Sequence, residues 1–531
     1  MYRIPIRHPS RAETSRQRSD QQLTSMPLRS RIPFFCRKPS RSRIPFFCRM
    51  PPRSRIPFFC SLRFRIPFLC LVCLSTASIP AQTTLTPDQT EAREIFKELI
   101  EINSSYKGGS TTPAAHAIAR RFLAAGFPAS DIRVLGPAGD KDSSVVVRMQ
   151  GISKTLKPIL LIAHLDVVEA LRSDWSLDPF VLTEKDGFFY GRGTSDIKDG
   201  AATLAEALLR LKRNHVVPQR TLILALTAGE EGGGGYNGMD WLLKNHRDFI
   251  DAAFALNVDA GDPEIQNGKR LLRGVQTSEK LYQSFALEVT NKGGHSSLPT
   301  PDNAIAQLSD AIGRASRFHF PVRLTETTRV FFARQANLQS GQLSSDMRAI
   351  AKDPHDSASA ARLSMSPTFN AQLRTTCVPT MIEGGHAPNA LPQRARAVIN
   401  CRIMPGETSD EIRAELVRVA ADTSVHITAI DDGSAIPTSP SPLTPEVMVP
   451  VEAVTRRLWP GVPVIPLMET GATDGAYLRA AGIPTYGVSG VFIDIDDVRA
   501  HGRDERIIVR SFYDGVEYIY QLVREYAGAT R

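Results

Sequence analysis

Apolar runs typical of buried strands alternate with helical periodicity from residue 86 onward, and this alternation limits the possible folds more than any other feature. Strand-like runs occupy residues 144–149, 158–163, 221–227 and 253–258, and helical patterns occupy 200–213 and 238–243. Such alternation predicts an α/β fold with a buried, mostly parallel sheet covered by helices. A capping-box sequence at residues 86–89 predicts a first helix that continues to Leu99.

Acidic and histidine residues follow three of the strand-like runs. His164 and Asp166 follow the run at 158–163, Glu230 and Glu231 follow the run at 221–227, and Asp259 follows the run at 253–258. Because the carboxyl ends of parallel strands share one edge of a sheet, where ligands bind, we expect these side chains to converge. One acidic residue after a strand is usually an ordinary turn residue, whereas three such strand ends indicate a site.

Two further residues complete a set that suits a two-metal hydrolase. Asp196 precedes the helical pattern at 200–213, and His501 lies near the C terminus. Two zinc ions about 3.5–4 Å apart need one bridging carboxylate and two terminal ligands each. A free carboxylate must also handle the proton of the attacking water. The seven residues fill each role, with one carboxylate over.

A second pattern begins near Gln276 and predicts an inserted α+β domain. Its expected strands are 281–290, 396–403 and 425–430, and its expected helices are 302–315 and 409–421. A body of about 450 residues usually exceeds one hydrophobic core, so two domains are expected. The predicted catalytic domain comprises residues 86–277 and 446–531, and residues 278–433 form the insert.

Residues 1–81 differ in composition from everything after them and read as a leader. The tetrapeptide Arg-Ile-Pro-Phe recurs at Arg31, Arg43, Arg55 and Arg65, which is incompatible with a packed core. A basic run, an apolar stretch at 66–74 and small residues up to 81 predict a signal peptide at about 50–81. Residues 1–49 resemble a translated upstream repeat. We therefore expect a secreted or periplasmic protein with no stable membrane span after cleavage.

Removing the leader changes the charge of the chain. The net charge is +9, and residues 1–81 hold 16 basic and 2 acidic residues, so the remainder carries 9 − 14 = −5. A mildly acidic body gives no reason to expect nucleic acid or an anionic membrane as a partner. Only Cys377 and Cys401 remain outside the leader. They are too few for a disulfide framework, and whether they pair in an oxidising compartment is left open.

Nine short motifs give the chain a resemblance to a known family. They are AHLDVV at Ala163, YGRGTSDIKDG at Tyr190, TAGEEGG at Thr227, NVDAG at Asn257, NKGGHSSLP at Asn291, GGHAPNALP at Gly384, CRIMPG at Cys401, ETGATDGAYL at Glu469 and AHGRDE at Ala500. In order and spacing the chain resembles the aminoacylase and glutamate carboxypeptidase family of dizinc peptidases over residues 90–528. The resemblance implies a zinc-peptidase-like catalytic domain with an inserted lid domain.

The resemblance also implies a role for each ligand candidate. Asp196 would bridge two zinc ions, for which Co²⁺ or Mn²⁺ are alternatives. The terminal ligands would be Glu231 and His501 for one ion, and His164 and Asp259 for the other. The peptide bond from Asp196 to Ile197 would be cis.

Two remaining carboxylates would then act without binding metal directly. Asp166 would accept the free ring N–H of His164, which fixes the tautomer of that ligand. Glu230 would be the general base, since a metal-bound Glu has lost the basicity needed to take a proton from water.

The insert and the C-terminal part would supply substrate contacts. His295 matches the family histidine that reaches the neighbouring protomer and stabilises the tetrahedral oxyanion. Asn389 and Arg402 match positions that hold the terminal carboxylate of the substrate, while Gly471 and Thr473 would line the cleft. A homodimer formed through the lid domain follows from the resemblance.

One departure points to a branch of the family. The insert is enlarged between residues 318 and 369 and leads into LRTTCVPTMIEGG at Leu373, as in the carboxypeptidase S and N-acyl-amino-acid hydrolase branch. We predict an exported dizinc exopeptidase of the carboxypeptidase type, which cleaves the amide bond next to a free C-terminal carboxylate. An N-acyl-amino-acid amidohydrolase is the alternative, and a non-catalytic metal-binding module is a weaker one. The expected substrate is a small peptide or an N-acyl amino acid.

Overall fold

The computed structural model describes residues 84–139, 141–232, 235–431, 433 and 435–528. The expected leader lies outside the described residues, so the signal peptide remains a prediction. Within the described ranges, no helix has both the length and the hydropathy needed to cross a bilayer.

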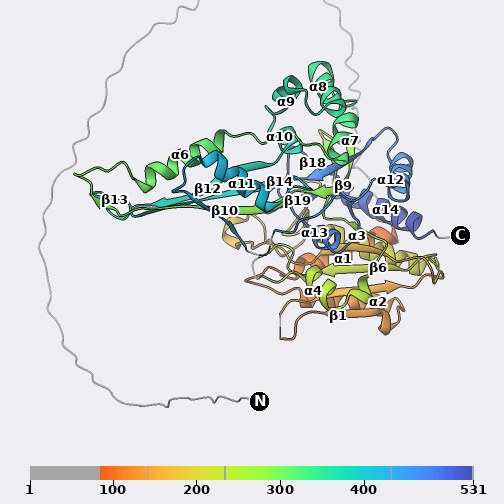
Figure 1. Cartoon of the computed structure of the whole chain (residues 1–531). Helices are drawn as coiled ribbons and strands as arrows, with labels where there is room; N and C mark the ends of the chain where they lie inside the picture. Colours follow the sequence, from red (N-terminus) through yellow and green to blue (C-terminus); the bar gives the residue numbers. More distant parts are fainter. Residues whose placement is uncertain (1–83, 140, 233–234, 432, 434, 529–531) are drawn as a thin grey trace, which may run out of the picture. The chain divides into compact units, whose positions relative to one another are not determined.

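A ten-stranded mixed sheet forms the centre of the large α/β part, which confirms the predicted fold class (Figure 1). In spatial order the strands are β1 (Ile132–Leu135), β2 (Ser144–Met149), β6 (Leu222–Thr227), β3 (Ile159–His164), β7 (Phe254–Asn257), β17 (Thr485–Gly487), β9 (Lys269–Glu279), β8 (Pro263–Gln266) and β18 (Ile493–Asp494), and β16 (Val464–Glu469) also pairs with β9. The four consecutive strands β6, β3, β7 and β17 run parallel to one another. The carboxyl ends of β3, β6 and β7 therefore lie on one edge, as the sequence predicted.

Helices cover both faces of this sheet because its central strands are apolar on both sides. Leu161 of β3 belongs to the core that also contains residues of α1 (Pro87–Glu101), α2 (Thr112–Ala124), α3 (Lys198–Arg213), α12 (Pro445–Leu458) and α14 (Val509–Tyr526). Leu160 and Ile162 face the opposite core with α4 (Gly238–Asn245), α5 (Arg247–Ile250) and α13 (Gly475–Ala480). The predicted capping box is present, since the side chains of Thr86 and Gln89 each accept from the other's backbone N–H.

The inserted segment forms a separate four-stranded antiparallel sheet, whose strands β10, β12 and β14 are seen side by side in Figure 1. Its order is β12 (Thr376–Gly384), β14 (Arg394–Ile403), β10 (Leu281–Thr290) and β15 (His426–Ile430). Helices α6 (Ala304–Arg317) and α11 (Ser409–Ala420) share a core with one face of this sheet. The short strands β11 (Gly294–His295) and β13 (Ala390–Leu391) pair with each other next to it.

Four helices occupy the enlarged stretch of the insert, for which no elements were named from the sequence. They are α7 (Glu326–Gln335), α8 (Gly341–Lys352), α9 (Ser357–Leu363) and α10 (Pro367–Leu373). Their apolar side chains share a core with Leu272 of β9 and Ile465 of β16. Helices of 7 to 12 residues are marginal alone and gain most of their stability from packing, so their local signal is weak.

A disulfide joins Cys377 of β12 to Cys401 of β14, which answers the question that the sequence left open. The two residues lie directly opposite each other in the antiparallel pair. Cys401 is fully buried in the core of the insert. The bond therefore ties the edge strand to the strand that carries Arg402.

Reducing this disulfide should destabilise the insert. A crosslink that closes a loop of this length stabilises the folded state by roughly 3 kcal/mol, mainly by restricting the unfolded chain. We expect dithiothreitol to lower the thermal unfolding midpoint by several degrees, measured by circular dichroism. The Cys377→Ala/Cys401→Ala variant should unfold at the lower midpoint with or without reductant. An unchanged midpoint for the reduced wild-type protein would contradict the prediction.

Candidate metal centre

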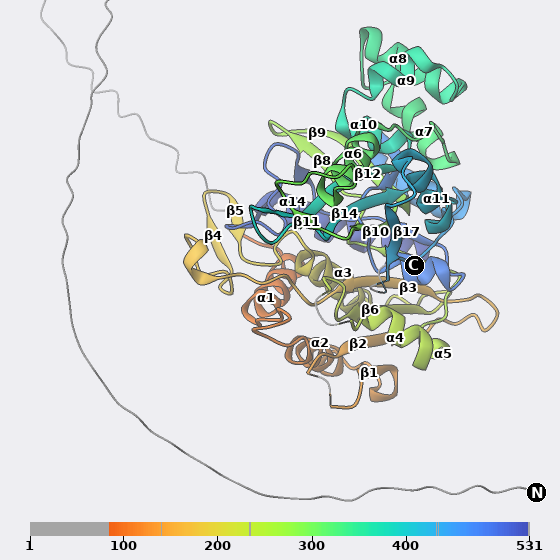
Figure 2. The ribbon, with the colours of Figure 1, turned by 60° about the vertical axis from the view of Figure 1, so that its left-hand side comes forward.

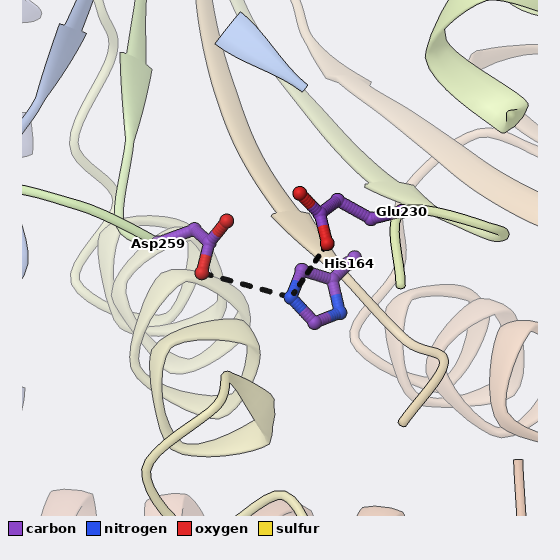
Figure 3. Close-up of side chains that lie close together, drawn as sticks. All are labelled: His164, Glu230 and Asp259. Carbon is purple, nitrogen blue, oxygen red and sulfur yellow. Dashed lines mark ion pairs between the residues drawn. The ribbon is translucent and has the colours of Figure 1, made fainter. Parts of the chain in front are cut away.

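The ends of three parallel strands supply three of the candidate ligands and the candidate base. His164 is the last residue of β3, Glu230 and Glu231 follow β6, and Asp259 follows β7. Figure 3 shows the side chains of His164, Glu230 and Asp259 pointing toward one another. His164 Nε2 lies 3.6 Å from Asp259 Oδ1 and 3.9 Å from Glu230 Oε2. The predicted convergence at one sheet edge is therefore present.

The two remaining ligands come from segments that a small second sheet holds together. In it, β4 (Thr183–Lys185) pairs with β5 (Phe188–Tyr190), and β5 pairs with β19 (Arg506–Ile508). Strand β5 leads into the turn that carries Asp196, and β19 follows the turn that carries His501. The pairing of β5 with β19 therefore brings these two ligands together although they are far apart in sequence.

Asp196 lies between the two histidines. His164 Nε2 is 3.2 Å from Asp196 Oδ1, and His501 Nε2 is 3.1 Å from Asp196 Oδ2. His501 Nε2 is also 2.9 Å from Glu231 Oε2. Since each oxygen of one carboxylate faces a different imidazole, the geometry matches a bridging ligand with one metal position on each side. The bond from Asp196 to Ile197 is cis, as predicted.

The donor set fits divalent metal ions. Ligand atoms of His164, Asp196 and Glu231 lie within 4.8 Å of one another, and so do those of His164, Glu230 and Asp259. Imidazole nitrogen and carboxylate oxygen are ligands that Zn²⁺ accepts, and Co²⁺ and Mn²⁺ accept the same donors. The residues thus suit a dinuclear centre without selecting one ion.

The charges at the centre shift the pKa values of its members. Burial alone would lower the pKa of His164, but Asp259 and Asp196 raise it well above its usual value. Burial raises the pKa of Asp259 to about 7. Hydrogen bonds to Asp196 and Glu231 raise the pKa of His501 to about 10. The carboxylates of Asp196, Glu230, Glu231 and Asp259 outnumber the two imidazoles. Bound cations would offset the excess negative charge.

Glu230 and Glu231 face different surroundings. Glu231 lies against His501, whereas Glu230 lines a cavity of about 980 Å³ that Thr473 also lines. Burial raises the pKa of Glu230 well above its usual value. A carboxylate that faces a cavity and holds protons more tightly than usual is suited to proton transfer.

Asp166 contacts His164 through its main chain, and not through its carboxylate as predicted. His164 Nδ1 lies 3.0 Å from the main-chain oxygen of Asp166 and 3.8 Å from its carboxylate. The ring N–H therefore has a backbone acceptor rather than the expected carboxylate. The carboxylate instead accepts from the backbone N–H groups of Glu230 at 3.3 Å and Glu231 at 3.0 Å. Asp166 thus fixes both the imidazole and the turn that carries the two glutamates.

Two buried carboxylates hold the ligand turns, although the sequence motifs gave no sign of this role. Glu505 forms a salt bridge with Arg192 at 2.5 Å and accepts from the backbone of Ser195 at 2.8 Å, next to Asp196. Asp474 accepts from Thr227 and Asn237, both at 2.6 Å, on either side of the glutamate turn. Both residues lie within motifs of the family resemblance, but a motif does not show which member faces the interior.

The insert residues lie at opposite ends of the antiparallel sheet. His295 is exposed on β11, where its Nδ1 hydrogen-bonds Ser297 Oγ at 2.7 Å. Asn389 precedes β13, and its carbonyl accepts from the residue after His295. Arg402 is near the other end of β14, eight residues beyond the start of that strand, or about 26 Å away at about 3.3 Å per residue. Within one chain Asn389 and Arg402 are therefore far apart, and their predicted roles at the substrate carboxylate stay a prediction.

Arg402 approaches the C-terminal part of the large sheet. Its guanidinium stacks on the Tyr282 ring, 4.6 Å from the ring centre, and donates to the carbonyl of Thr470 at 3.1 Å. Thr470 directly precedes Gly471, which is exposed. Thr473 donates to Glu279 at 3.0 Å. The segment with Gly471 and Thr473 thus joins Arg402 to the cavity that Glu230 lines.

Comparison with known proteins agrees with this geometry. The sequence model of peptidase family M20/M25/M40 matches residues 160–525. The human N-fatty-acyl-amino acid synthase/hydrolase PM20D1 is 28% identical over 393 residues, which cover 72% of this chain and 77% of that protein. The probable carboxypeptidase S-like 2 of Dictyostelium discoideum is 28% identical over 390 residues, 72% of this chain and 74% of the relative.

Solved structures share the fold. A metallo-carboxypeptidase of the M20 family from Sulfolobus solfataricus aligns with a TM-score of 0.61 at 18% identity, over 82% of this chain and 99% of that chain. A dinuclear metal-binding M20 peptidase of Bacillus subtilis aligns with a TM-score of 0.54 at 12% identity, over 83% of this chain and 99% of that one. At these identities the likeness concerns the fold alone.

Proposed function

The chain belongs to peptidase family M20/M25/M40, and on this premise we propose that it is a dizinc exopeptidase of the carboxypeptidase type. In this proposal it cleaves the amide bond next to a free carboxylate. The single observation that carries it is the position of Asp196 between the imidazoles of His164 and His501. The relatives named carboxypeptidase S-like and N-fatty-acyl-amino acid synthase/hydrolase support the two versions of this activity, on peptides and on N-acyl amino acids.

The proposed ligands are those expected from the sequence. His164 and Asp259 would hold one ion, Glu231 and His501 the other, and Asp196 both. Bound zinc would polarise the scissile carbonyl and lower the pKa of the attacking water. Glu230 would take the proton of that water and pass it to the leaving amine.

Arg402 is the proposed anchor for the substrate carboxylate. A guanidinium can bind a carboxylate through two parallel hydrogen bonds. Arg402 is already oriented by Tyr282 and Thr470, so little side-chain freedom would be lost on binding. Its distance from the reacting carbonyl would then decide which amide bond is cleaved.

His295 and Asn389 are proposed to act in the site of a partner subunit. Their position on the exposed β11–β13 pair supports this role, as does the edge strand β12 of the same sheet. Val378, Met381 and Ile382 expose more than half of their surface on β12. Exposed apolar edge strands pair readily with another chain, and a symmetric dimer would cover this one.

We propose that the protein is exported. The disulfide between Cys377 and Cys401 supports an oxidising compartment, where such bonds persist. The proposed division into a catalytic domain (86–277 and 446–531) and an insert (278–433) follows the two separate sheets. The signal peptide at about 50–81 remains a prediction.

Carboxylate recognition by Arg402 gives a test of this function. The wild-type protein with zinc should hydrolyse N-acetyl amino acids or dipeptides, lose activity with a chelator, and act poorly on the matching methyl esters. Arg402→Met should lower kcat/KM for the free acids by about 10- to 100-fold, the worth of charged hydrogen bonds. It should also abolish the preference over the ester, as measured by release of the free amine.

Arg396→Met on the same strand is the matched control, because Arg396 lies six residues away on the same face of β14. It should behave as wild type. An Arg402→Met variant that keeps the preference for the free acid would exclude Arg402 as the anchor. A metal-loaded protein that hydrolyses no peptide or N-acyl amino acid would favour the non-catalytic binding module.

A further inference from the structure

A buried ion pair lies at the wall of the cavity that Glu230 lines. Glu279 is the last residue of β9, and its Oε1 lies 2.7 Å from Arg479 Nη2 on α13. The side chain of Arg479 is 1% exposed and that of Glu279 is 3% exposed. Because separating the two would leave an uncompensated charge in the interior, the pair keeps both side chains in place.

The ion pair holds the hydroxyl of Thr473. Thr473 Oγ1 donates to Glu279 Oε2 at 3.0 Å and accepts from the backbone N–H of Gly475 at 3.1 Å. A hydroxyl has one proton to donate and two lone pairs that accept, and a carboxylate paired with a guanidinium only accepts. The single proton of Thr473 is therefore committed to Glu279. One lone pair remains, so the hydroxyl can accept a further hydrogen bond but cannot donate one.

Thr473 connects the proposed carboxylate anchor to the cavity of the proposed base. Thr473 and Glu279 line the cavity of about 980 Å³ that Glu230 also lines. Helix α4 contributes residues to the same cavity, and Figure 2 shows α4 beside β6, the strand that leads to Glu230. Three residues before Thr473, the carbonyl of Thr470 accepts from Arg402. In a substrate with its carboxylate at the anchor and its carbonyl at the metal centre, the N–H of the scissile amide lies between these two groups.

We propose that Thr473 accepts a hydrogen bond from the N–H of the scissile amide, and that Glu279 and Arg479 are positioning residues that keep its hydroxyl in the accepting orientation. The inference rests on the proposed hydrolysis next to a free carboxylate and adds the means by which an amide is distinguished from an ester. An N–H that loses its water on binding needs an acceptor, whereas the oxygen of an ester would face the lone pair of Thr473. The arrangement therefore favours amide substrates.

The test compares two substrates that both carry the free carboxylate for Arg402. One is an N-acyl amino acid, and the other is the matching ester of the 2-hydroxy acid, in which an oxygen replaces the scissile N–H. Thr473→Val removes the hydroxyl at nearly constant volume and should lower kcat/KM for the amide by about tenfold, the worth of one such hydrogen bond. For the ester, kcat/KM should stay within about twofold of the wild-type value, because the hydroxyl has no N–H to accept from.

Glu279→Gln tests the positioning role. The amide group of glutamine can donate to Thr473 Oγ1, which frees the hydroxyl proton and lets the hydroxyl act as a donor. We expect kcat/KM to fall about tenfold for the amide and not to fall for the ester. Gly475→Ala is the second variant in case Glu279→Gln does not fold, because a Cβ there would lie 3.0 Å from Thr473 Oγ1 and 3.1 Å from Arg479 Nη1. It keeps both charges and should displace the hydroxyl, with the same selective loss.

Two control variants separate the orientation of the hydroxyl from general stability. Thr473→Ser keeps the hydroxyl and should keep the wild-type ratio of kcat/KM for the amide to kcat/KM for the ester. Thr428→Val makes the same replacement at an exposed position of β15 and should match the wild-type protein for both substrates. Metal content per chain is measured for every variant, so that a loss of metal is not mistaken for a loss of the hydrogen bond.

The outcomes distinguish a failure of this inference from a failure of the proposed function. If Thr473→Val leaves the amide unchanged, or lowers kcat/KM equally for amide and ester, Thr473 does not accept from the scissile N–H and the proposed function stands. If Thr473→Val is selective but Glu279→Gln and Gly475→Ala affect both substrates equally, the positioning role is overturned. If the metal-loaded wild-type protein hydrolyses neither substrate, the proposed function fails and the inference fails with it.

Discussion

Glu230→Gln is expected to leave two metal ions bound and to lower kcat by about 10²- to 10⁴-fold, the usual contribution of a general base. Glutamine has nearly the shape of glutamate but cannot accept the proton of the attacking water. Glu231→Gln is the matched control, because Glu231 lies 2.9 Å from His501 Nε2 and is the proposed ligand. It should lose metal as well as activity. Metal content per chain and kcat, measured on the same samples, separate the two roles.

The comparison is needed because the geometry alone allows an exchange of roles. Ligand atoms of Glu230, His164 and Asp259 lie close enough to hold one ion by themselves. If Glu230→Gln lost metal and regained activity with added zinc, Glu230 would be a ligand. The assignment of the pair would then have to be reversed.

Mixing two inactive variants, His295→Ala and Glu230→Gln, is expected to restore up to about a quarter of wild-type activity. In a symmetric dimer with His295 acting on the partner's metals, each mixed dimer has one complete site. Random exchange at equal concentrations makes half of the dimers mixed, and half of their sites are complete. His295→Ala alone should lower kcat by about 10²- to 10³-fold, as for the loss of an oxyanion donor.

The exposed position of His295 on β11 is the structural basis of this expectation. Subunit exchange must be verified in the same sample, for example by mass measurement of tagged dimers. Dimers that have exchanged but remain inactive would place His295 within its own chain's site or outside catalysis. Activity from either variant before mixing is the baseline to subtract.

Much of the catalytic half could be predicted because its signals are local. A short run of apolar residues such as 159–163 is typical of a buried strand, and a polar residue at its end must face solvent or a ligand. The strand ends alone therefore predicted that His164, Glu230 and Asp259 converge, and they do. The role of each residue came from the resemblance and stays a proposal.

Other features depend on contacts between residues far apart in sequence. The pairing of β5 with β19 brings Asp196 to His501, and no local pattern encodes it. The same is true of Glu505, which hydrogen-bonds the backbone next to Asp196 across 310 residues. The length of β14, which separates Asn389 from Arg402 within one chain, is also absent from the motifs.

By itself, the sequence determined which strands are buried, where they end and which side chains capable of binding metal follow them. These properties depend on hydrophobic periodicity over a few residues, which the chain carries locally. Only the tertiary structure decided that the carboxylate of Asp166 holds the glutamate turn rather than His164. It also decided that four short helices, α7–α10, leave a cavity against β8, β9, β16 and β18. Such features arise when separately formed surfaces pack together, and their shape depends on both partners at once.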